Sequence, residues 1–360
     1  MIKMEKIPIV IPAYEPDNRL IKLLQEFNEN DIGPVILVND GSCHEYDPIF
    51  EKAERLLNEH DGVLLKHPQN MGKGRALKTA FSYIINNYQN AIGAITADSD
   101  GQHTVECIKA VMDAFYNEPK CLVLGVRQFN GAGIPWKSRF GNNLTKKVFA
   151  VVSGVHVSDT QTGLRGIPIS FMEQLLEVKG DRFEFEMQML LESAGKYNIV
   201  EIPIKTVYDS EENHQTHFNP IKDSIKIYRI LGKKILKYIF SSFSSSIIDL
   251  ILFSFFCLIL KNKNLNLYVA ISTVLARIIS ATYNYFMNYK VVFKSSESIK
   301  TSGIKYAMLA AVQMSMSAFL VTTFVRIFSV IPEVVVKIII DTILFFVSYH
   351  IQQRYIFFKS

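Results

Sequence analysis

The residues with the clearest chemical potential are two aspartates that follow an apolar segment. Asp98 and Asp100 stand at alternate positions after residues 91–97, and Gln102 and His103 come soon after them. Two carboxylates spaced in this way at a strand end can share a hard divalent cation, which prefers oxygen ligands and keeps positions for substrate phosphates. An acidic turn without a ligand would have the same composition. Three other polar segments at equivalent places favour the cation site.

A second segment favours the binding of an anion. It reads Asn70-Met71-Gly72-Lys73-Gly74-Arg75-Ala76-Leu77. Backbone N–H groups at the start of a helix attract anions, and Lys73 or Arg75 could reach a phosphate. The segment is not a Walker A loop, since no Ser or Thr follows Lys73, and Leu77 replaces the third glycine of a dinucleotide fingerprint. A turn with a solvated lysine is the alternative.

A parallel sheet would bring these segments together. Apolar runs at 7–11, 35–38, 63–65 and 91–97 are typical of strands, and residues 18–28, 48–58 and 74–87 have the spacing of amphipathic helices. Strict alternation of strand and helix predicts an α/β fold with a mainly parallel sheet, whose ligands lie at the carboxyl ends of the strands. Asp40, in Asn39-Asp40-Gly41-Ser42, follows the second strand. It could hold a base or ribose, or only shape an Asx turn. With Asp98 and Asp100 it describes a site for a metal and a nucleoside diphosphate.

Composition divides the chain into two parts. Of 360 residues, 49% are hydrophobic, and the formal charge is +5. From residue 226 onward there are 16 basic and 4 acidic residues, a charge of +12, which leaves −7 for residues 1–225. The basic part is also strongly apolar, which favours a membrane and argues against nucleic acid as its partner. We expect a catalytic domain at 1–229 and a transmembrane domain at 230–360.

Four apolar stretches in the second part are long enough to span a membrane. We expect all-α helices at about 238–260, 267–290, 304–328 and 334–357. Lys and Arg gather before the first helix, between the second and third, and at the end of the chain, so the positive-inside rule places both ends in the cytosol. Asp249, Arg277 and Asp341 fall near the midplane, where we expect mutual pairing. Residues 288–294 and 353–359 are similar at a 65-residue step, which indicates a repeated helical hairpin.

The compartment follows from the N-terminus and the cysteines. Residues 1–6 are too polar for a signal peptide, and the four cysteines lie far apart without a metal-binding spacing. We therefore expect a multi-pass protein of the cell membrane whose first part stays in the reducing cytosol.

Five ordered motifs resemble those of family 2 glycosyltransferases, which have the GT-A fold. The motifs are Ile11-Pro12-Ala13-Tyr14, Asn39-Asp40-Gly41-Ser42, the segment from Asn70 to Leu77, Asp98-Ser99-Asp100-Gly101-Gln102 and Asp159-Thr160-Gln161-Thr162-Gly163-Leu164-Arg165. The resemblance covers about residues 5–225 and points to the polyprenyl-phosphate branch, which includes dolichol-phosphate mannose synthases and bactoprenol glucosyltransferases. The second part is similar to GtrA-like four-helix membrane domains.

The resemblance implies roles for individual residues. It makes Asp98, Asp100 and Gln102 the group that binds a divalent cation, Mg²⁺ or Mn²⁺, and the diphosphate. It puts Pro12, Tyr14 and Asp40 beside the nucleotide, Lys73 and Arg127 near its phosphates, and Arg165 toward the lipid phosphate or the sugar.

Two further positions depart from the family pattern or stay open. Many relatives read Pro-x-Tyr-Asn-Glu, whereas here Glu15 directly follows Tyr14, which leaves the role of Glu15 at the ribose undecided. His217 lies where relatives often carry a basic ligand of the phosphate, and a polar loop histidine is the alternative.

The expected activity is inverting transfer of a sugar from a UDP- or GDP-sugar to a polyprenyl phosphate on the cytosolic leaflet, for modification of cell-envelope glycans. The partners would be the donor, the lipid acceptor and the membrane, and the chain could act as a homo-oligomer. A polysaccharide or glycolipid hydroxyl as acceptor would require a base, for which Glu184 or Glu186 would serve unless they lie on an exposed helix face. A non-catalytic, nucleotide-sugar-binding partner of a flippase is the third alternative.

Overall fold

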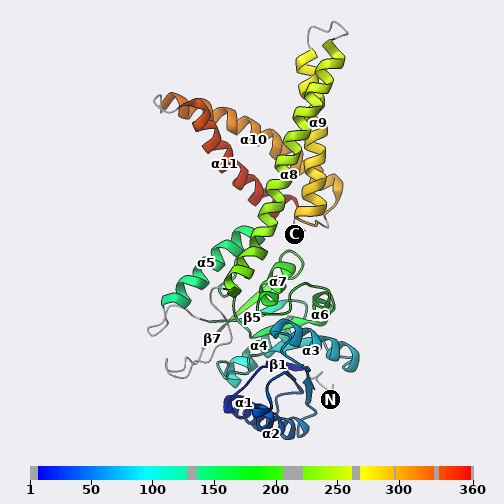
Figure 1. Cartoon of the computed structure of the whole chain (residues 1–360), viewed down its shortest axis with the longest axis vertical. Coiled ribbons are helices and arrows are strands. Elements are labelled where there is room, and N and C mark those ends of the chain that lie inside the picture. The colour runs from blue at the N-terminus through cyan, green and yellow to red at the C-terminus, as the bar shows by residue number, and fades with distance from the viewer. Residues whose placement is uncertain are drawn as a thin grey trace. The chain divides into compact units, whose positions relative to one another are not determined.

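A computed structural model describes residues 7–127, 136–205, 222–261, 268–295, 297–327 and 332–357 (Figure 1). The chain separates into two compact units. The first comprises residues 1–150 and 155–230, and the second comprises residues 151–154 and 231–360.

The first unit is built on a seven-stranded sheet in the order β3-β2-β1-β4-β6-β5-β7. The strands are β1 (Ile9–Ala13), β2 (Val35–Asn39), β3 (Val63–Lys66), β4 (Gly93–Thr96), β5 (Leu122–Arg127), β6 (Arg165–Pro168) and β7 (Ile199–Ile204). All paired neighbours run parallel except β6, which is antiparallel to both β4 and β5. The predicted α/β fold with a mainly parallel sheet is therefore confirmed. β4 is shorter than the predicted strand at 91–97.

Helices cover both faces of this sheet. They are α1 (Asn18–Glu29), α2 (Asp47–Asn58), α3 (Lys73–Asn87), α4 (Val105–Asn117), α6 (Ile169–Leu176) and α7 (Glu184–Ser193), with a short 3₁₀ turn at His44–Tyr46. A further helix, α5 (Trp136–Ser153), lies between β5 and β6 in the chain. The apolar sides of α1, α2 and α4 form one core with the strands, and α3 contacts α6 and α7 on the other face. Caps start two of these helices, since Asp17 accepts from the backbone of Arg19 and Thr104 from that of Cys107.

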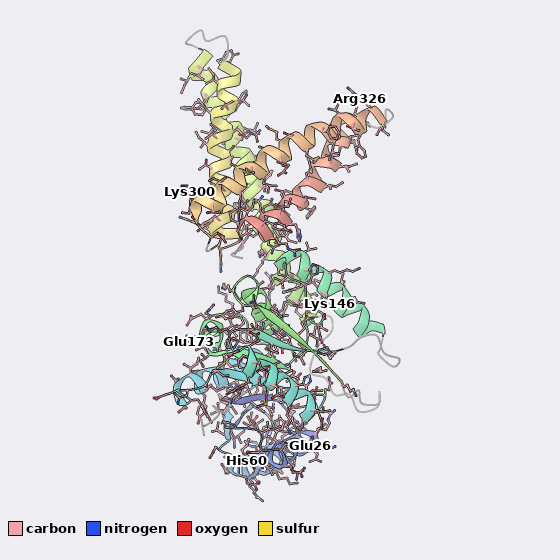
Figure 2. The ribbon with its side chains drawn as sticks, turned by 180° about the vertical axis from the view of Figure 1, so that it is seen from behind. Glu26, His60, Lys146, Glu173, Lys300 and Arg326 are labelled. Atoms are coloured by element: carbon pink, nitrogen blue, oxygen red, sulfur yellow. The ribbon has the colours of Figure 1, made fainter. Side chains whose placement is uncertain are left out.

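The second unit contains two helical hairpins. The first has α8 (Lys222–Lys261) and α9 (Tyr268–Met287), and the second has α10 (Ile299–Ile327) and α11 (Glu333–Ile351). Two of these helices are long and apolar enough, within the described residues, to cross a membrane, namely Ile225–Leu260 and Ile299–Ile327. Lys300 lies near the start of α10 and Arg326 near its end, so charge flanks the apolar run at both ends (Figure 2).

The two hairpins are structural repeats, with a step different from the one that the sequence suggested. Each second helix ends in one turn of π-helix, at Asn288–Val292 and Gln352–Ile356, and these turns are 64 residues apart. Asn288 donates to Gln352 across the pair at 3.0 Å. The predicted 65-residue step aligns the Phe-Lys pairs at 293–294 and 358–359. It differs by one residue from the 64-residue step between the π-turns.

Tyrosines join the hairpins reciprocally. Tyr238 of α8 packs against Tyr349 of α11 with ring centroids 4.9 Å apart, and Tyr306 of α10 packs against Tyr285 of α9 at 5.5 Å. Each tyrosine on a first helix therefore contacts the second helix of the other hairpin, so the repeats depend on one another for burial.

Polar pairs lie within each hairpin. Asp249 accepts from Ser280 at 2.7 Å and lies 3.4 Å from Arg277, which confirms the expected pairing of these charges. Asp341 accepts from Ser317 at 2.5 Å. Asp249 and Ser317 stand equally far after Tyr238 and Tyr306, so the two contacts occupy equivalent places in the repeats.

Candidate active site

One edge of the sheet gathers the polar segments of the first unit. Because β1, β2 and β4 are parallel, the residues that follow them lie at the same edge. β6 runs the opposite way, and Thr96 at the end of β4 pairs with Arg165 at the start of β6. The loop before β6 therefore reaches the same edge, where Thr96 donates to the carbonyl of Gly163 at 2.7 Å.

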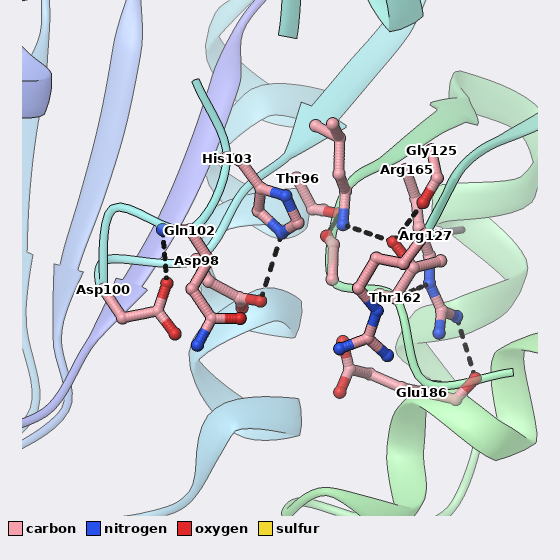
Figure 3. A network of polar contacts seen from close by, with 12 residues as sticks. Thr96, Asp98, Asp100, Gln102, His103, Gly125, Arg127, Thr162, Arg165 and Glu186 are labelled. Carbon is pink, nitrogen blue, oxygen red and sulfur yellow. Dashed lines mark hydrogen bonds and ion pairs between the residues drawn. The ribbon is translucent and has the colours of Figure 1, made fainter. Parts of the chain in front are cut away.

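The loop after β4 carries the acidic pair (Figure 3). The backbone of Gln102 donates to Asp100 at 3.0 Å, and Nε2 of His103 lies 3.5 Å from Oδ2 of Asp98. Gly163 presses against this loop, since a Cβ there would lie 2.2 Å from the same oxygen of Asp98. A larger residue at Gly163 would therefore displace the Asp98 carboxylate.

The basic segment meets the acidic pair through Lys73. Its Nζ lies 2.7 Å from Oδ1 of Asp98 and 3.0 Å from Oε1 of Glu186. The side chain of Glu186 is only 12% exposed and belongs to α7. The alternative of an exposed helix face is therefore wrong for Glu186, whose place in the site the helix spacing alone could not show.

Two glycines let the basic segment pack closely on the start of α7 and on the chain just before it. A Cβ at Gly72, whose φ is +100°, would lie 2.4 Å from the carbonyl oxygen of Asp181, and one at Gly74 would lie 2.5 Å from Cβ of Phe185. Arg75 and Lys78 also contact the Asp181 carboxylate, at 2.9 and 3.1 Å. These contacts fix the backbone from which Lys73 projects.

The charges shift one another's proton affinities. Burial by itself raises the pKa of Asp98, but the ammonium of Lys73 and the ring of His103 outweigh it and hold that pKa well below its ordinary value. Burial, and then the charge of Asp98, raise the pKa of Asp100. Burial lowers the pKa of Lys73, but Asp98 and Glu186 outweigh it and raise that pKa. Lys73 and Asp98 are therefore charged at neutral pH.

The residues expected at the nucleotide follow β1 and β2. Pro12 is buried within β1, and Tyr14 is half-buried beyond it. A hydrogen bond to Glu15, followed by burial, raises the pKa of Tyr14. Glu15 has a φ of 49° and donates its N–H to Ser42 at 2.8 Å. This contact ties the first polar loop to the second.

Asp40 occupies a different place from a free nucleotide ligand. It is 2% exposed, and its carboxylate accepts from the backbones of Met71 and Gly72 at 2.9 and 2.7 Å and contacts His67 at 2.7 Å. Both oxygens are therefore engaged by the chain itself. This arrangement favours a role for Asp40 in shaping the basic segment, and direct contact with the nucleotide stays a prediction.

Arg127 and Arg165, which the resemblance places near phosphates, are both largely buried and are paired with groups of the chain itself. Arg127 forms a two-pronged pair with the fully buried Asp159, at 2.6 and 3.1 Å. Arg165 is 1% exposed and donates to the carbonyls of Thr162 and Glu186, both at 2.9 Å. Arg165 thus lies beneath the site and holds the backbone of Glu186 (Figure 3). Its predicted contact with the lipid phosphate gains no support from this placement. His217 lies outside the described residues.

The donor set fits a hard divalent cation that is completed by a substrate. Asp98 and Asp100 supply carboxylate oxygens, and Gln102 adds an amide oxygen on the same loop. In the described part of the chain no three His, Cys, Asp or Glu side chains form a full metal cage. Mg²⁺ in particular is usually bound by one or two carboxylates together with substrate phosphates.

Known proteins match both units. The family described as Glycosyl transferase family 2 matches residues 9–175, and the family described as GtrA/DPMS, transmembrane domain matches residues 237–357. A UDP-N-acetylglucosamine–dolichyl-phosphate N-acetylglucosaminyltransferase of Methanococcus voltae is 28% identical, over 56% of this chain and 86% of that protein. A dolichyl-phosphate beta-glucosyltransferase of Trichomonas vaginalis is 27% identical, over 44% of this chain and 52% of that protein.

A solved structure also aligns with the chain. It is a mannosyltransferase from Pyrobaculum calidifontis in complex with GDP-Man and Mn²⁺, with 12% identity and a TM-score of 0.40, over 97% of this chain and 87% of that one. With the two family matches, the α/β sheet and the apolar hairpins, the chain joins a family 2 glycosyltransferase domain to a GtrA/DPMS transmembrane domain.

Proposed function

We propose that this chain transfers a sugar from a UDP- or GDP-sugar to a polyprenyl phosphate at the cytosolic face of a membrane. The observation that carries the proposal is the Asp98 and Asp100 pair, held at the ligand-binding edge of the sheet in a chain that also has a GtrA/DPMS transmembrane domain. The names of the relatives, which act on dolichyl phosphate, support a lipid phosphate as the acceptor.

The residues act mainly on the leaving diphosphate. Asp98 and Asp100, with Gln102, would hold a divalent cation, which when bound neutralises charge on the departing diphosphate. Lys73 is close enough to donate to a phosphate oxygen beside Asp98. Preorganised charges of this kind stabilise the transition state without a reorganisation cost.

The chemistry of the acceptor decides whether a base is needed. A lipid phosphate is already anionic at neutral pH, so its oxygen can attack the anomeric carbon directly, and direct displacement inverts that centre. A sugar hydroxyl would need a base. Glu186 is engaged with the Lys73 ammonium at 3.0 Å, which disfavours that use and so favours a phosphate acceptor. Modification of a cell-envelope glycan would follow as the use of the product.

The second unit would hold the enzyme where its acceptor lies. We propose four membrane passes, with α9 and α11 joining the two helices whose length and apolarity suffice for a span. The Lys and Arg distribution supports cytosolic ends on both sides of this unit. The same basic residues would attract anionic lipid headgroups.

The test uses the purified full chain in lipid, a panel of UDP- and GDP-sugars, and three acceptors: polyprenyl phosphate, diacylglycerol and a polysaccharide. We expect a mild-acid-labile lipid-phosphate sugar that forms only with a divalent cation and not after chelation. Transfer only to a hydroxyl acceptor would favour the second candidate. Binding of a nucleotide sugar without turnover on any acceptor would contradict an enzymatic role.

A further inference from the structure

Lys73 already occupies the cation position beside Asp98. Its ammonium is shared by Asp98 and Glu186 at 2.7 and 3.0 Å, and its side chain is only 18% exposed. The ammonium therefore bridges two carboxylates, and Asp100 stands two residues after Asp98 on the same loop.

We propose that Lys73 is the resident counter-ion of Asp98 and that Glu186 is the positioning residue that retains Lys73 when a divalent cation binds. Before metal binding, the ammonium reduces repulsion among the partly buried carboxylates. When a metal takes the Asp98 oxygen, the ammonium stays on Glu186, where it remains available to a phosphate. This inference rests on the proposed function only in treating Asp98 as a cation ligand.

The surrounding contacts hold the backbone in place, so only the side chain of Lys73 has to move when a metal replaces it at Asp98. The backbone of Arg75 donates to the carbonyl of Asp181 at 2.9 Å, and the close packing of Gly72 and Gly74 holds the start of α3 in place. Arg165 fixes the carbonyl of Glu186 at 2.9 Å. The backbone that carries Lys73 and the backbone of Glu186 are therefore both fixed. The ammonium of Lys73 can leave Asp98 and stay on Glu186 without a change in the backbone.

The first experiment measures binding of Mn²⁺ alone, by electron paramagnetic resonance, to the purified full chain without donor. Lys73→Met removes both a competing cation and a positive charge, so we expect the Kd for Mn²⁺ to fall by roughly tenfold. Glu186→Gln removes the second carboxylate that holds the Lys73 ammonium. The ammonium then pairs with Asp98 alone and competes more strongly with Mn²⁺, so we expect a higher Kd for Mn²⁺. Lys52→Met is the control, because it removes the same charge from an exposed position of α2, and we expect an unchanged Kd. An unchanged or higher Kd for Lys73→Met would overturn the proposal.

The second experiment measures binding of UDP and GDP with Mn²⁺ saturating. We expect Lys73→Met and Glu186→Gln each to weaken binding of the preferred nucleotide, and the double variant to bind no more weakly than Lys73→Met alone. Additive losses would show that Glu186 acts independently of Lys73 and would contradict its positioning role. Neither measurement requires transfer. Tighter Mn²⁺ binding without lipid-linked product would therefore refute only the proposed function, and product without tighter binding would refute only this inference.

Discussion

Polar side chains in the α/β unit come from loops far apart in sequence, whereas those of the helical unit recur at equivalent places in two hairpins. In the first unit, Lys73, Asp98 and Glu186 meet with an excess of negative charge. In the second, Asp249 meets Arg277 and Ser280 within its own hairpin, and Asn288 meets Gln352 across the repeat. A cluster with unpaired negative charge favours the binding of a cation, whereas a pair of opposite charges or hydrogen-bonded amides stabilises the fold. The comparison therefore assigns chemistry to the first unit and packing to the second.

The largest effect is expected where two loops of the first unit touch. Gly163→Ala would place a Cβ 2.2 Å from the Asp98 carboxylate, which must then move. We expect transfer to fall by about 100-fold or more, the loss typical when one preorganised charge is misplaced. Initial rates with the preferred donor measure it. Gly232→Ala is the control, because a Cβ there meets nothing within 4 Å, and we expect its rate to match that of the unaltered chain. If Gly163→Ala and Gly232→Ala had equal rates, the result would contradict a catalytic role for this edge of the sheet.

The next effect concerns stability and lies in the second unit. Asn288 is fully buried and donates to Gln352 and to Asn284. Asn288→Leu would leave buried amide groups without partners, at a cost of about 1–3 kcal/mol in the free energy of unfolding. Thermal unfolding in detergent measures the loss. We expect Gln352→Leu to cost more, because Gln352 also donates to Tyr238 and Ser348, both at 3.0 Å. We expect the rate per folded molecule of Asn288→Leu to stay near that of the unaltered chain. A lost rate in a folded variant would give this pair a chemical role.

The smallest effect tests how charge holds the basic segment. Burial would raise the pKa of Asp181, but hydrogen bonds from Lys78 and Arg75 outweigh it and lower that pKa below 3.8. Because the folded-state pKa is depressed, the stabilisation is present above pH 3.8 and is lost as the pH falls through the lower folded value. Asp181 is 42% exposed, so we expect Asp181→Asn to cost less than about 1 kcal/mol at pH 7. Unfolding measured from pH 7 to pH 3 should show the difference shrinking. Asp113→Asn, on an exposed position of α4, should show none.

The sequence predicted the strand ends well because alternation and turn residues are local signals. Asp98, Asp100, Asp40 and Lys73 all follow strands in the order that a parallel sheet requires. The antiparallel β6 does not follow from that alternation. Its direction brings Gly163 and Arg165 to the same edge.

The expectations for Asp40 and Arg165 stay predictions, and the structure shows why the sequence could not place these side chains. A motif shows that a charged residue is present, but not whether its own chain already satisfies it. Asp40 is engaged by backbone N–H groups, and Arg165 by backbone carbonyls, which only the folded loops reveal. The role of Glu186 depended on which face of α7 meets α3. The repeat register failed because matching residue types at the helix ends did not reveal where the π-turns begin.

The comparison between the units is tested most directly by one pair of substitutions. Asp98→Asn and Asp249→Asn each remove one carboxylate charge, the first at the strand edge and the second in the first hairpin. The measurement is the initial rate of sugar transfer to polyprenyl phosphate by the purified full chain in lipid, with the divalent cation saturating. We expect Asp98→Asn to lower the rate by about 100-fold or more and Asp249→Asn to leave it within a few-fold of the unaltered chain. An unchanged rate for Asp98→Asn would contradict the account.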